Sequence, residues 1–133
     1  MDRAFPRNIA SLEAIFAFAE EFFAREAIGP EPRFAVQFAL EEMFTNMVKY
    51  QAHSPHEILI RLECADDRIE LRLTDYDVEP FDPTRVEPPA IDVPLEKRRV
   101  GGLGVHLTRM VMDSVEYEYV DRQSTITLTK KLG

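Results

Sequence analysis

Two alternating apolar runs near the middle of the chain constrain its fold more than any other feature. Their apolar residues occupy every second position and are Ile58, Ile60, Leu62, Ile69, Leu71 and Leu73. Asp66 and Asp67 lie between the runs as turn residues. The intervening positions carry charge: Arg61, Glu63, Glu70 and Arg72. The pattern predicts an antiparallel β-hairpin with one face in water and one apolar face that other elements must cover.

Two amphipathic segments ahead of the hairpin can supply that cover. The first is predicted to run from a cap at Ser11 to the helix-ending pair Gly29 and Pro30. The second is predicted from about Pro32 to about Tyr50. Their apolar residues recur at three- and four-residue intervals: Leu12, Ile15, Phe16, Ala19, Phe22 and Phe23, then Val36, Leu40, Met43, Phe44 and Met47.

The second half of the chain completes the predicted fold. Residues 76–100 show little periodicity and contain five of the nine prolines, as is typical of a functional lid or a disordered segment. A short helix from Val105 to about Asp113 and two strands, at 115–119 and 126–130, follow. This order predicts a single α+β domain over residues 1–133, a two-layer sandwich with helices on one face of a mixed or antiparallel sheet.

Composition narrows the classes of function. The 16 basic and 24 acidic residues give a formal charge of −8, which opposes contact with the phosphate backbone of nucleic acid. Cys64 is the only cysteine, so no intramolecular disulfide can form. The sequence has no signal-peptide pattern and no apolar window approaching the ~20 residues that span a bilayer. We expect a soluble, cytoplasmic protein that binds neither nucleic acid directly nor membrane.

The predicted second helix carries a candidate metal-binding pair. Glu42 and Asn46 are four residues apart and project from one helix face, whereas Glu41 points about 100° away. Carboxylate and amide oxygens suit Mg²⁺, which often combines one or two protein ligands with substrate phosphates. Taken alone, the pair is more typical of an exposed polar helix face.

Two further segments bear on ligand binding. Asp75 ends a strand, where a partly buried carboxylate can accept a hydrogen bond from an exocyclic amine such as that of adenine, although turn-capping aspartates are commoner. Glycines at 101, 102 and 104 allow a ligand close to the backbone, and helix-initial N–H groups attract phosphate. The glycine segment lacks the Lys-Ser/Thr ending of a Walker A loop and follows no strand in a βαβ unit. Glycine clusters also mark flexible turns.

In combination, the three segments resemble the N, G1 and G2 boxes of the GHKL ATPases. A helix with Glu-x-x-x-Asn, a strand ending in Asp, a long lid and a Gly-Gly-x-Gly helix start follow one another in that order. Within the superfamily, the chain is most similar to the small anti-sigma-factor serine kinases of the RsbW type, also through residues 80–83 and 101–117. The resemblance spans nearly the whole chain and implies a Bergerat-type fold.

The resemblance also implies cofactors and residue roles. ATP and Mg²⁺ would be bound, with residues 76–100 as the ATP lid. Asn46 would bind Mg²⁺, Asp75 would read adenine, and Glu42 would orient or deprotonate the attacking hydroxyl. The backbone that would hold the phosphates belongs to Gly101, Gly102, Leu103, Gly104 and Val105.

The function implied by the resemblance is that of an ATP-dependent protein-serine kinase that also sequesters a sigma factor. Its substrate would be a serine on a STAS-type anti-anti-sigma protein, and related kinases act as homodimers. The main departure is Asp77, which stands where the family has glycine, with one extra residue before Phe81. An inward Asp77 side chain would crowd the purine or repel its phosphates, whereas an outward bulge would leave the pocket intact.

Two other functions stay open at this point. The first is a non-catalytic regulator that keeps the fold and the partner surface but has a degenerate nucleotide site, which Asp77 motivates. The second is the ATPase part of a histidine kinase. We expect this less, because no long dimerisation helix with a phospho-acceptor histidine precedes the boxes in this sequence.

Overall fold

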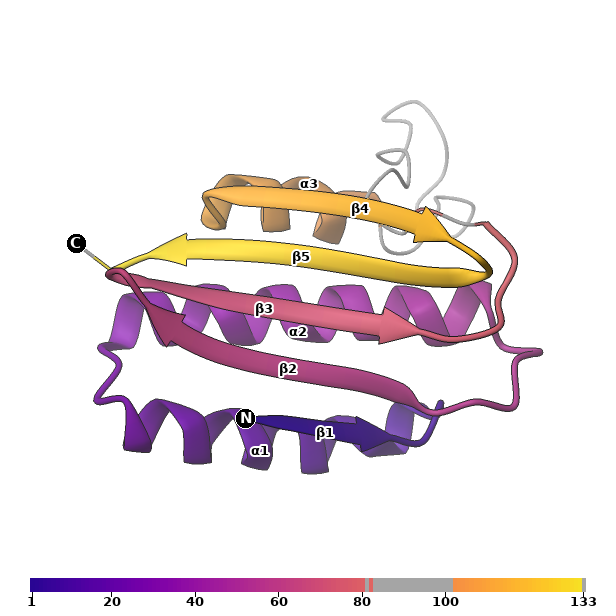
Figure 1. The fold of residues 1–133 in the computed structure, drawn as a ribbon. Helices are drawn as coiled ribbons and strands as arrows, with labels where there is room; N and C mark the ends of the chain where they lie inside the picture. Colours follow the sequence, from indigo (N-terminus) through magenta and orange to yellow (C-terminus); the bar gives the residue numbers. More distant parts are fainter. Residues whose placement is uncertain (81, 83–101, 133) are drawn as a thin grey trace, which may run out of the picture.

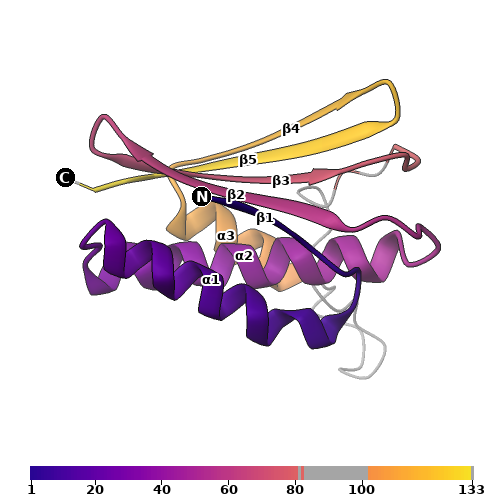
Figure 2. The ribbon, with the colours of Figure 1, turned by 60° about the horizontal axis from the view of Figure 1, so that its bottom comes forward.

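The computed structural model describes residues 1–80, 82 and 102–132, with only the backbone for 102 and 103. A five-stranded sheet forms one layer, and three α-helices form the other on a single face of that sheet (Figures 1 and 2). This arrangement confirms the predicted α+β sandwich. Most of the predicted lid, residues 81 and 83–100, lies outside the described residues, as does Gly101.

The sheet has the strand order β1-β2-β3-β5-β4, and all four pairings are antiparallel. The predicted hairpin forms β2 (Ile58–Ala65) and β3 (Arg68–Asp75), and the last two predicted strands form β4 (Ser114–Val120) and β5 (Gln123–Lys131). The edge strand β1 (Asp2–Phe5) has no counterpart among the predicted elements. Its sequence, Asp-Arg-Ala-Phe, lacks the alternation that marks a strand, and only the last of these four residues is buried.

Left-handed residues close both hairpins. Asp66 and Asp67 have φ angles of 54° and 59°, and Asp121 and Arg122 have φ angles of 52° and 64°. Positive φ at both central residues is the requirement of a two-residue type I′ turn, whose twist matches that of the flanking strands. The Asp-Asp pair that the sequence singled out therefore fixes the register of β2 against β3.

The helical layer consists of α1 (Leu12–Arg25), α2 (Pro30–Tyr50) and α3 (Gly102–Val111). A short 3-10 helix, η1 (Ile9–Ser11), precedes α1. Helix α2 begins two residues before the predicted start, because Pro30 is tolerated in a first turn where its missing N–H is not needed. Helix α3 begins three residues before the predicted Val105.

The N-cap prediction for Ser11 was wrong in its chemistry. Ser11 precedes α1, but its side chain makes no capping hydrogen bond to that helix. Its hydroxyl instead donates to the carbonyl oxygen of Pro6 at 2.8 Å. The Asn8 side chain accepts a hydrogen bond from the Ala10 N–H at 2.8 Å and so caps η1. The chain between β1 and α1 is thus a braced turn.

The two layers enclose one apolar core. The apolar face of the β2–β3 hairpin is fully buried against the helices, as predicted. The aromatic residues near the N-terminus mostly serve this core: Phe18, Phe22 and Phe23 are buried, and the rings of Phe5 and Phe18 meet edge to face at 5.6 Å. No helix in the described part of the chain has the length and apolar character needed to cross a bilayer.

Candidate functional site

Three elements bring the sequence motifs to one end of the sandwich. Strand β3 ends at Asp75, the C-terminal half of α2 carries Glu42 and Asn46, and α3 begins at Gly102 (Figure 1). The end of β1 and the β4–β5 turn lie at this same end, which we call the motif end. The β2–β3 turn and the α1–α2 connection lie at the opposite end, which we call the turn end.

The carboxylate of Glu42 lies directly against Gly104 of α3. A Cβ atom on Gly104 would fall 1.8 Å from Oε2 of Glu42 and 2.8 Å from its Oε1. Only a residue without a side chain therefore leaves the carboxylate in this position. The fully buried Thr108 donates its hydroxyl hydrogen to the Gly104 carbonyl at 2.8 Å and supports this part of α3. The structure thus joins the first and third sequence motifs in one contact.

The environment of Glu42 favours proton transfer. Burial is the main cause that raises the pKa of the Glu42 carboxyl, and the negative charge of Glu41 raises it further. A carboxylate with a raised pKa accepts a proton more readily than a solvated one. The direction of this shift is compatible with the role of proton acceptor that the sequence predicts for Glu42.

Asn46 is buried with an incomplete set of hydrogen bonds. It is 1% exposed, and its Nδ2 has no hydrogen-bond partner among the described residues, which is rare for a buried amide. Nearby in the sequence, Gln51 donates from Nε2 to the Glu79 carbonyl at 3.0 Å, while no described residue bonds to its Oε1. Unpartnered amides at the motif end fit a site that a ligand completes, since an amide oxygen can coordinate Mg²⁺ and an amide nitrogen can donate to phosphate.

The donor set also indicates how a cation would be held. Within the part of the chain that the structure describes, no group of three or more His, Cys, Asp or Glu side chains could bind a metal ion. Mg²⁺ in nucleotide sites commonly uses one or two protein groups and completes its shell with phosphates and water. Asn46 fits that mode of binding.

Asp75 is held by an arginine from the N-terminal segment. Nη1 of Arg7 donates to Oδ2 of Asp75 at 3.0 Å, and Nη2 donates to Oδ1. The Arg7 side chain is 4% exposed and the Asp75 side chain 2%. The carboxylate that the sequence assigns to purine recognition is therefore already paired on both oxygens.

Asp77 points away from the interior. Its φ angle is 53°, and its side chain is 62% exposed. Nε of Arg122 donates to its Oδ1 at 2.7 Å, and Nε2 of His56 lies 3.5 Å from its Oδ2. The hydrogen bond from Arg122 is the main cause that lowers the pKa of Asp77. The left-handed conformation is the one that glycine adopts most easily, so Asp77 takes a glycine-like backbone and turns its charge outward.

The segment after Asp75 is fastened to the β4–β5 turn. Val78 is buried, and its N–H donates to the Arg122 carbonyl at 3.0 Å. The hydroxyl of Tyr119 donates to the Val78 carbonyl at 2.7 Å. These contacts bury Val78 directly after Asp77, whereas Asp77 itself and Tyr76 before it stay exposed.

The glycine segment is described only in part. Gly102 is the first residue of α3, so the helix-initial N–H groups belong to the segment predicted to bind phosphate. Val105 is 4% exposed and forms part of the apolar core. Gly101 and the Leu103 side chain lie outside the described residues. The assignment of this backbone to phosphate binding stays a prediction.

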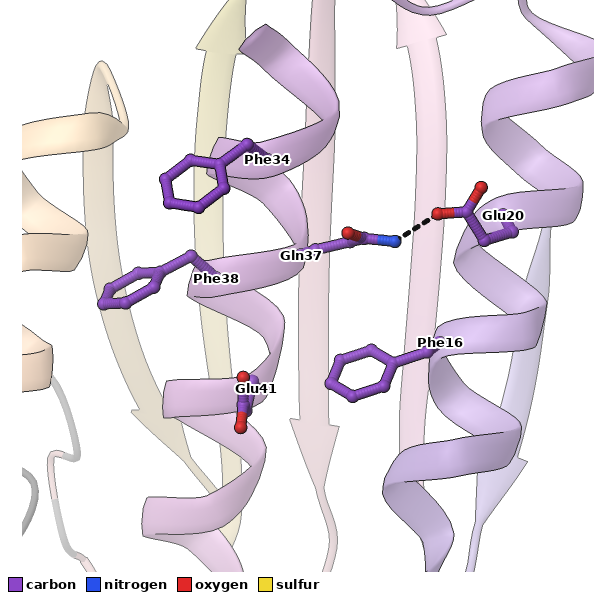
Figure 3. A pocket seen from close by; sticks show the side chains of 6 residues that line it. All are labelled: Phe16, Glu20, Phe34, Gln37, Phe38 and Glu41. Carbon is purple, nitrogen blue, oxygen red and sulfur yellow. Dashed lines mark hydrogen bonds between the residues drawn. The ribbon is translucent and has the colours of Figure 1, made fainter. Parts of the chain in front are cut away.

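An apolar hollow of about 330 Å³ lies between α1 and α2. Figure 3 shows it with the strands behind the helices. The stacked rings of Phe34 and Phe38 line it on α2, Phe16 lines it on α1, and a hydrogen bond from Gln37 to Glu20 spans the two helices. Phe34 is 62% exposed.

Sequence reasoning missed Arg7 and Arg122, the two cations that neutralise Asp75 and Asp77. Their carboxylate partners lie 68 and 45 residues away, so no local spacing reveals the pairs. In the sequence, Arg7 is marked only by its position after Pro6, close to the predicted first helix, and this position does not identify its partner. Charge counting alone cannot distinguish such an arginine from a solvated one.

Comparison with known proteins identifies the family of the domain. The family model for the histidine kinase-like ATPase domain matches residues 5–130. The serine-protein kinases RsbW of Listeria innocua serovar 6a and Listeria monocytogenes serotype 4a are each 29% identical over 107 residues, which cover 74% of this chain and 65% of each kinase. The matched region thus spans less than two thirds of those kinases.

A solved structure, the histidine kinase AdeS of Acinetobacter baumannii, superposes with a TM-score of 0.52 at 17% identity, covering 100% of this chain and 68% of that one. At this identity the likeness supports the fold alone. Because the family model covers nearly the whole chain, this protein belongs to the histidine kinase-like ATPase domain family.

Proposed function

We propose that this chain binds ATP with Mg²⁺ at the motif end and transfers the γ-phosphoryl group to a serine of a STAS-type anti-anti-sigma protein. The observation that carries the proposal is the contact of Glu42 with Gly104, which sets a proton acceptor against the first turns of α3. The similarity to the RsbW kinases supports the choice of reaction. By the same similarity we propose a sigma factor as the second partner and a homodimer as the working form.

Each residue has a defined task in this proposal. Asn46 holds Mg²⁺, which neutralises charge on the phosphates when bound, and the helix-initial N–H groups of α3 hold the phosphate oxygens. Asp75 accepts a hydrogen bond from the purine amine. Glu42 takes the proton of the serine hydroxyl as the serine oxygen bonds to the γ-phosphorus. The bond from that phosphorus to its bridging oxygen breaks, and ADP leaves.

Phosphoryl transfer to a purified STAS partner from radiolabelled ATP tests the proposal. Glu42→Gln keeps the shape of the side chain but removes the proton acceptor, so transfer should fall by about 100-fold or more while Mg-ATP still binds. Glu31→Gln changes a carboxylate in the first turn of the same helix, at the turn end, and serves as the matched control. Equal labelling by wild type and Glu42→Gln would remove Glu42 from the reaction.

A non-catalytic regulator is the second candidate function. The observation that favours it is the Arg7–Asp75 pair. Arg7 donates to both oxygens of the Asp75 carboxylate, so the edge that faces Arg7 is not open to a purine amine. Calorimetry with Mg-ATP separates the two candidates. The absence of binding heat would support the regulator, whereas binding that weakens in Asp75→Asn would support the kinase.

A further inference from the structure

The Arg7–Asp75 pair links the N-terminal segment to the proposed base-recognition carboxylate. We propose that Arg7 is a gate: it occupies Asp75 in the nucleotide-free protein and leaves it when a purine binds, so the segment between β1 and α1 regulates access to the site. The inference rests on the proposed function, since it concerns the same carboxylate.

Arg7 occupies both oxygens of the Asp75 carboxylate. Arg7 donates to both oxygens from its two Nη atoms, in the end-on arrangement in which the edge of the guanidinium faces the edge of the carboxylate. A purine amine directed at that same edge needs the space that the guanidinium fills. Arg7 and the base therefore compete for one edge of one side chain.

The guanidinium of Arg7 does not use all of its hydrogen-bond donors among the described residues. Nε of Arg7 is buried and has no hydrogen-bond partner in the part of the chain that the structure describes. A buried donor left unpaired destabilises the closed arrangement relative to one in which the guanidinium reaches water. Departure of Arg7 would satisfy this donor, so the closed gate is held less firmly than a fully bonded ion pair.

Arg7 lies on a short segment between the edge strand β1 and the helix η1. On one side, β1 pairs only with β2, at the edge of the sheet. On the other side, Ser11 and Asn8 brace the turn through the Pro6 carbonyl, to which the Asn8 N–H donates at 2.8 Å. Arg7 thus sits on a short braced turn next to an edge strand, where its side chain can swing without unravelling the sheet.

A purely structural role for Arg7 predicts different behaviour. In that case the arginine only neutralises a buried carboxylate, and its removal would weaken the site together with the fold. A gate predicts that removal tightens nucleotide binding even though the nucleotide-free protein becomes less stable. Nucleotide affinity therefore distinguishes the two roles, whereas thermal stability alone does not.

Calorimetric titration of the full chain with Mg-ATP is the test. Arg7→Gln should bind Mg-ATP about tenfold more tightly than wild type, as expected if roughly nine in ten nucleotide-free molecules have the gate closed. Arg61→Gln removes an exposed arginine that pairs with Glu63 on the sheet and should leave the affinity unchanged. Arg7→Lys retains the charge but loses the paired donors, and it should tighten binding by a smaller factor.

The outcomes separate the gate from the proposed function. Equal or weaker binding by Arg7→Gln, with clear binding by wild type, overturns the gate and leaves the kinase proposal standing. No binding by wild type, Arg7→Gln or Arg7→Lys overturns both. If Arg7→Gln does not fold, the Arg7→Lys titration decides alone: tighter binding supports the gate, and unchanged or weaker binding overturns it.

Discussion

The two ends of the sandwich share the same sheet and helices but differ in the burial of several polar side chains, which are exposed at the turn end and buried at the motif end. At the turn end, Asp66 and Asp67 are exposed and close a tight turn, and the Asp67 carbonyl accepts at 2.8 Å from the N–H of Leu132, which follows β5. At the motif end, Asn46 and Asp75 are each 1% exposed. Within residues 1–80, 82 and 102–132, three buried polar atoms there lack partners: Arg7 Nε, Asn46 Nδ2 and Gln51 Oε1.

The two ends therefore differ in how completely their described polar groups are hydrogen bonded or exposed to water. The β2–β3 turn follows local rules of turn chemistry, and the side chains of Asp66 and Asp67 are exposed to water. Buried polar groups without partners cost free energy, so a protein retains them where a ligand or a conformational change uses them. Matched substitutions at the two ends should therefore have unequal consequences.

The largest expected difference is between two glycines. Gly104→Ala places a Cβ on the Glu42 carboxylate, which is the movable end of a flexible side chain. The fold should persist, but Glu42 should be displaced, and phosphoryl transfer should fall by about 100-fold. Gly29→Ala, at the turn end, meets no atom within 4 Å and should leave transfer unchanged. Full activity in Gly104→Ala would show that the position of Glu42 is irrelevant to the reaction.

A second, smaller difference is expected between two aspartates. Asp75→Asn removes the charged acceptor and offers an amide, so Mg-ATP affinity should fall by about 10- to 100-fold. Asp67→Asn at the turn end should have no effect, because asparagine also tolerates the left-handed conformation. Calorimetry measures both affinities.

Stability must be controlled in that comparison, because Asp75→Asn leaves Arg7 without its counterion. The double variant Arg7→Gln with Asp75→Asn removes the whole pair and should restore much of the lost stability without restoring binding. Wild-type affinity in either variant would exclude Asp75 from base recognition.

The smallest expected effect is a shift of the pH profile. If ionised Glu42 is the base, transfer declines as pH falls through its raised pKa, at a higher pH than for an ordinary glutamate. Glu41→Gln removes a negative neighbour, so the pKa of Glu42 should fall and the acid limb should move to lower pH. Glu31→Gln, at the other end of α2, should not move it. A shift in the opposite direction in Glu41→Gln would contradict this electrostatic explanation.

The sequence predicts the parts of the fold that depend on near neighbours. Alternation from Ile58 to Leu73 and the Asp66-Asp67 turn identify the β2–β3 hairpin, and the three- and four-residue spacing identifies α1 and α2. Strand β1 is not predictable in this way, because its pairing with β2 is tertiary and Phe5 is its only buried residue.

The candidate site is predictable to a similar degree and for the same reason. The Glu42 and Asn46 spacing and the strand-end position of Asp75 are local patterns, and in the structure both β3 and the C-terminal half of α2 run toward the motif end. The cations that neutralise Asp75 and Asp77 come from distant parts of the chain, and the outward turn of Asp77 depends on a backbone conformation set by the buried Val78 beside it. Neither feature leaves a pattern in the sequence.

The central claim is that α2, β3 and the start of α3 together bind one nucleotide. Mapping the backbone amide resonances by nuclear magnetic resonance during a titration with Mg-ATP tests it most directly. The account predicts saturable shifts that cluster at residues 42–46, 75–78 and 102–108, with the β2–β3 turn unaffected. Shifts confined to the hollow between α1 and α2, or no shifts at all, would contradict it.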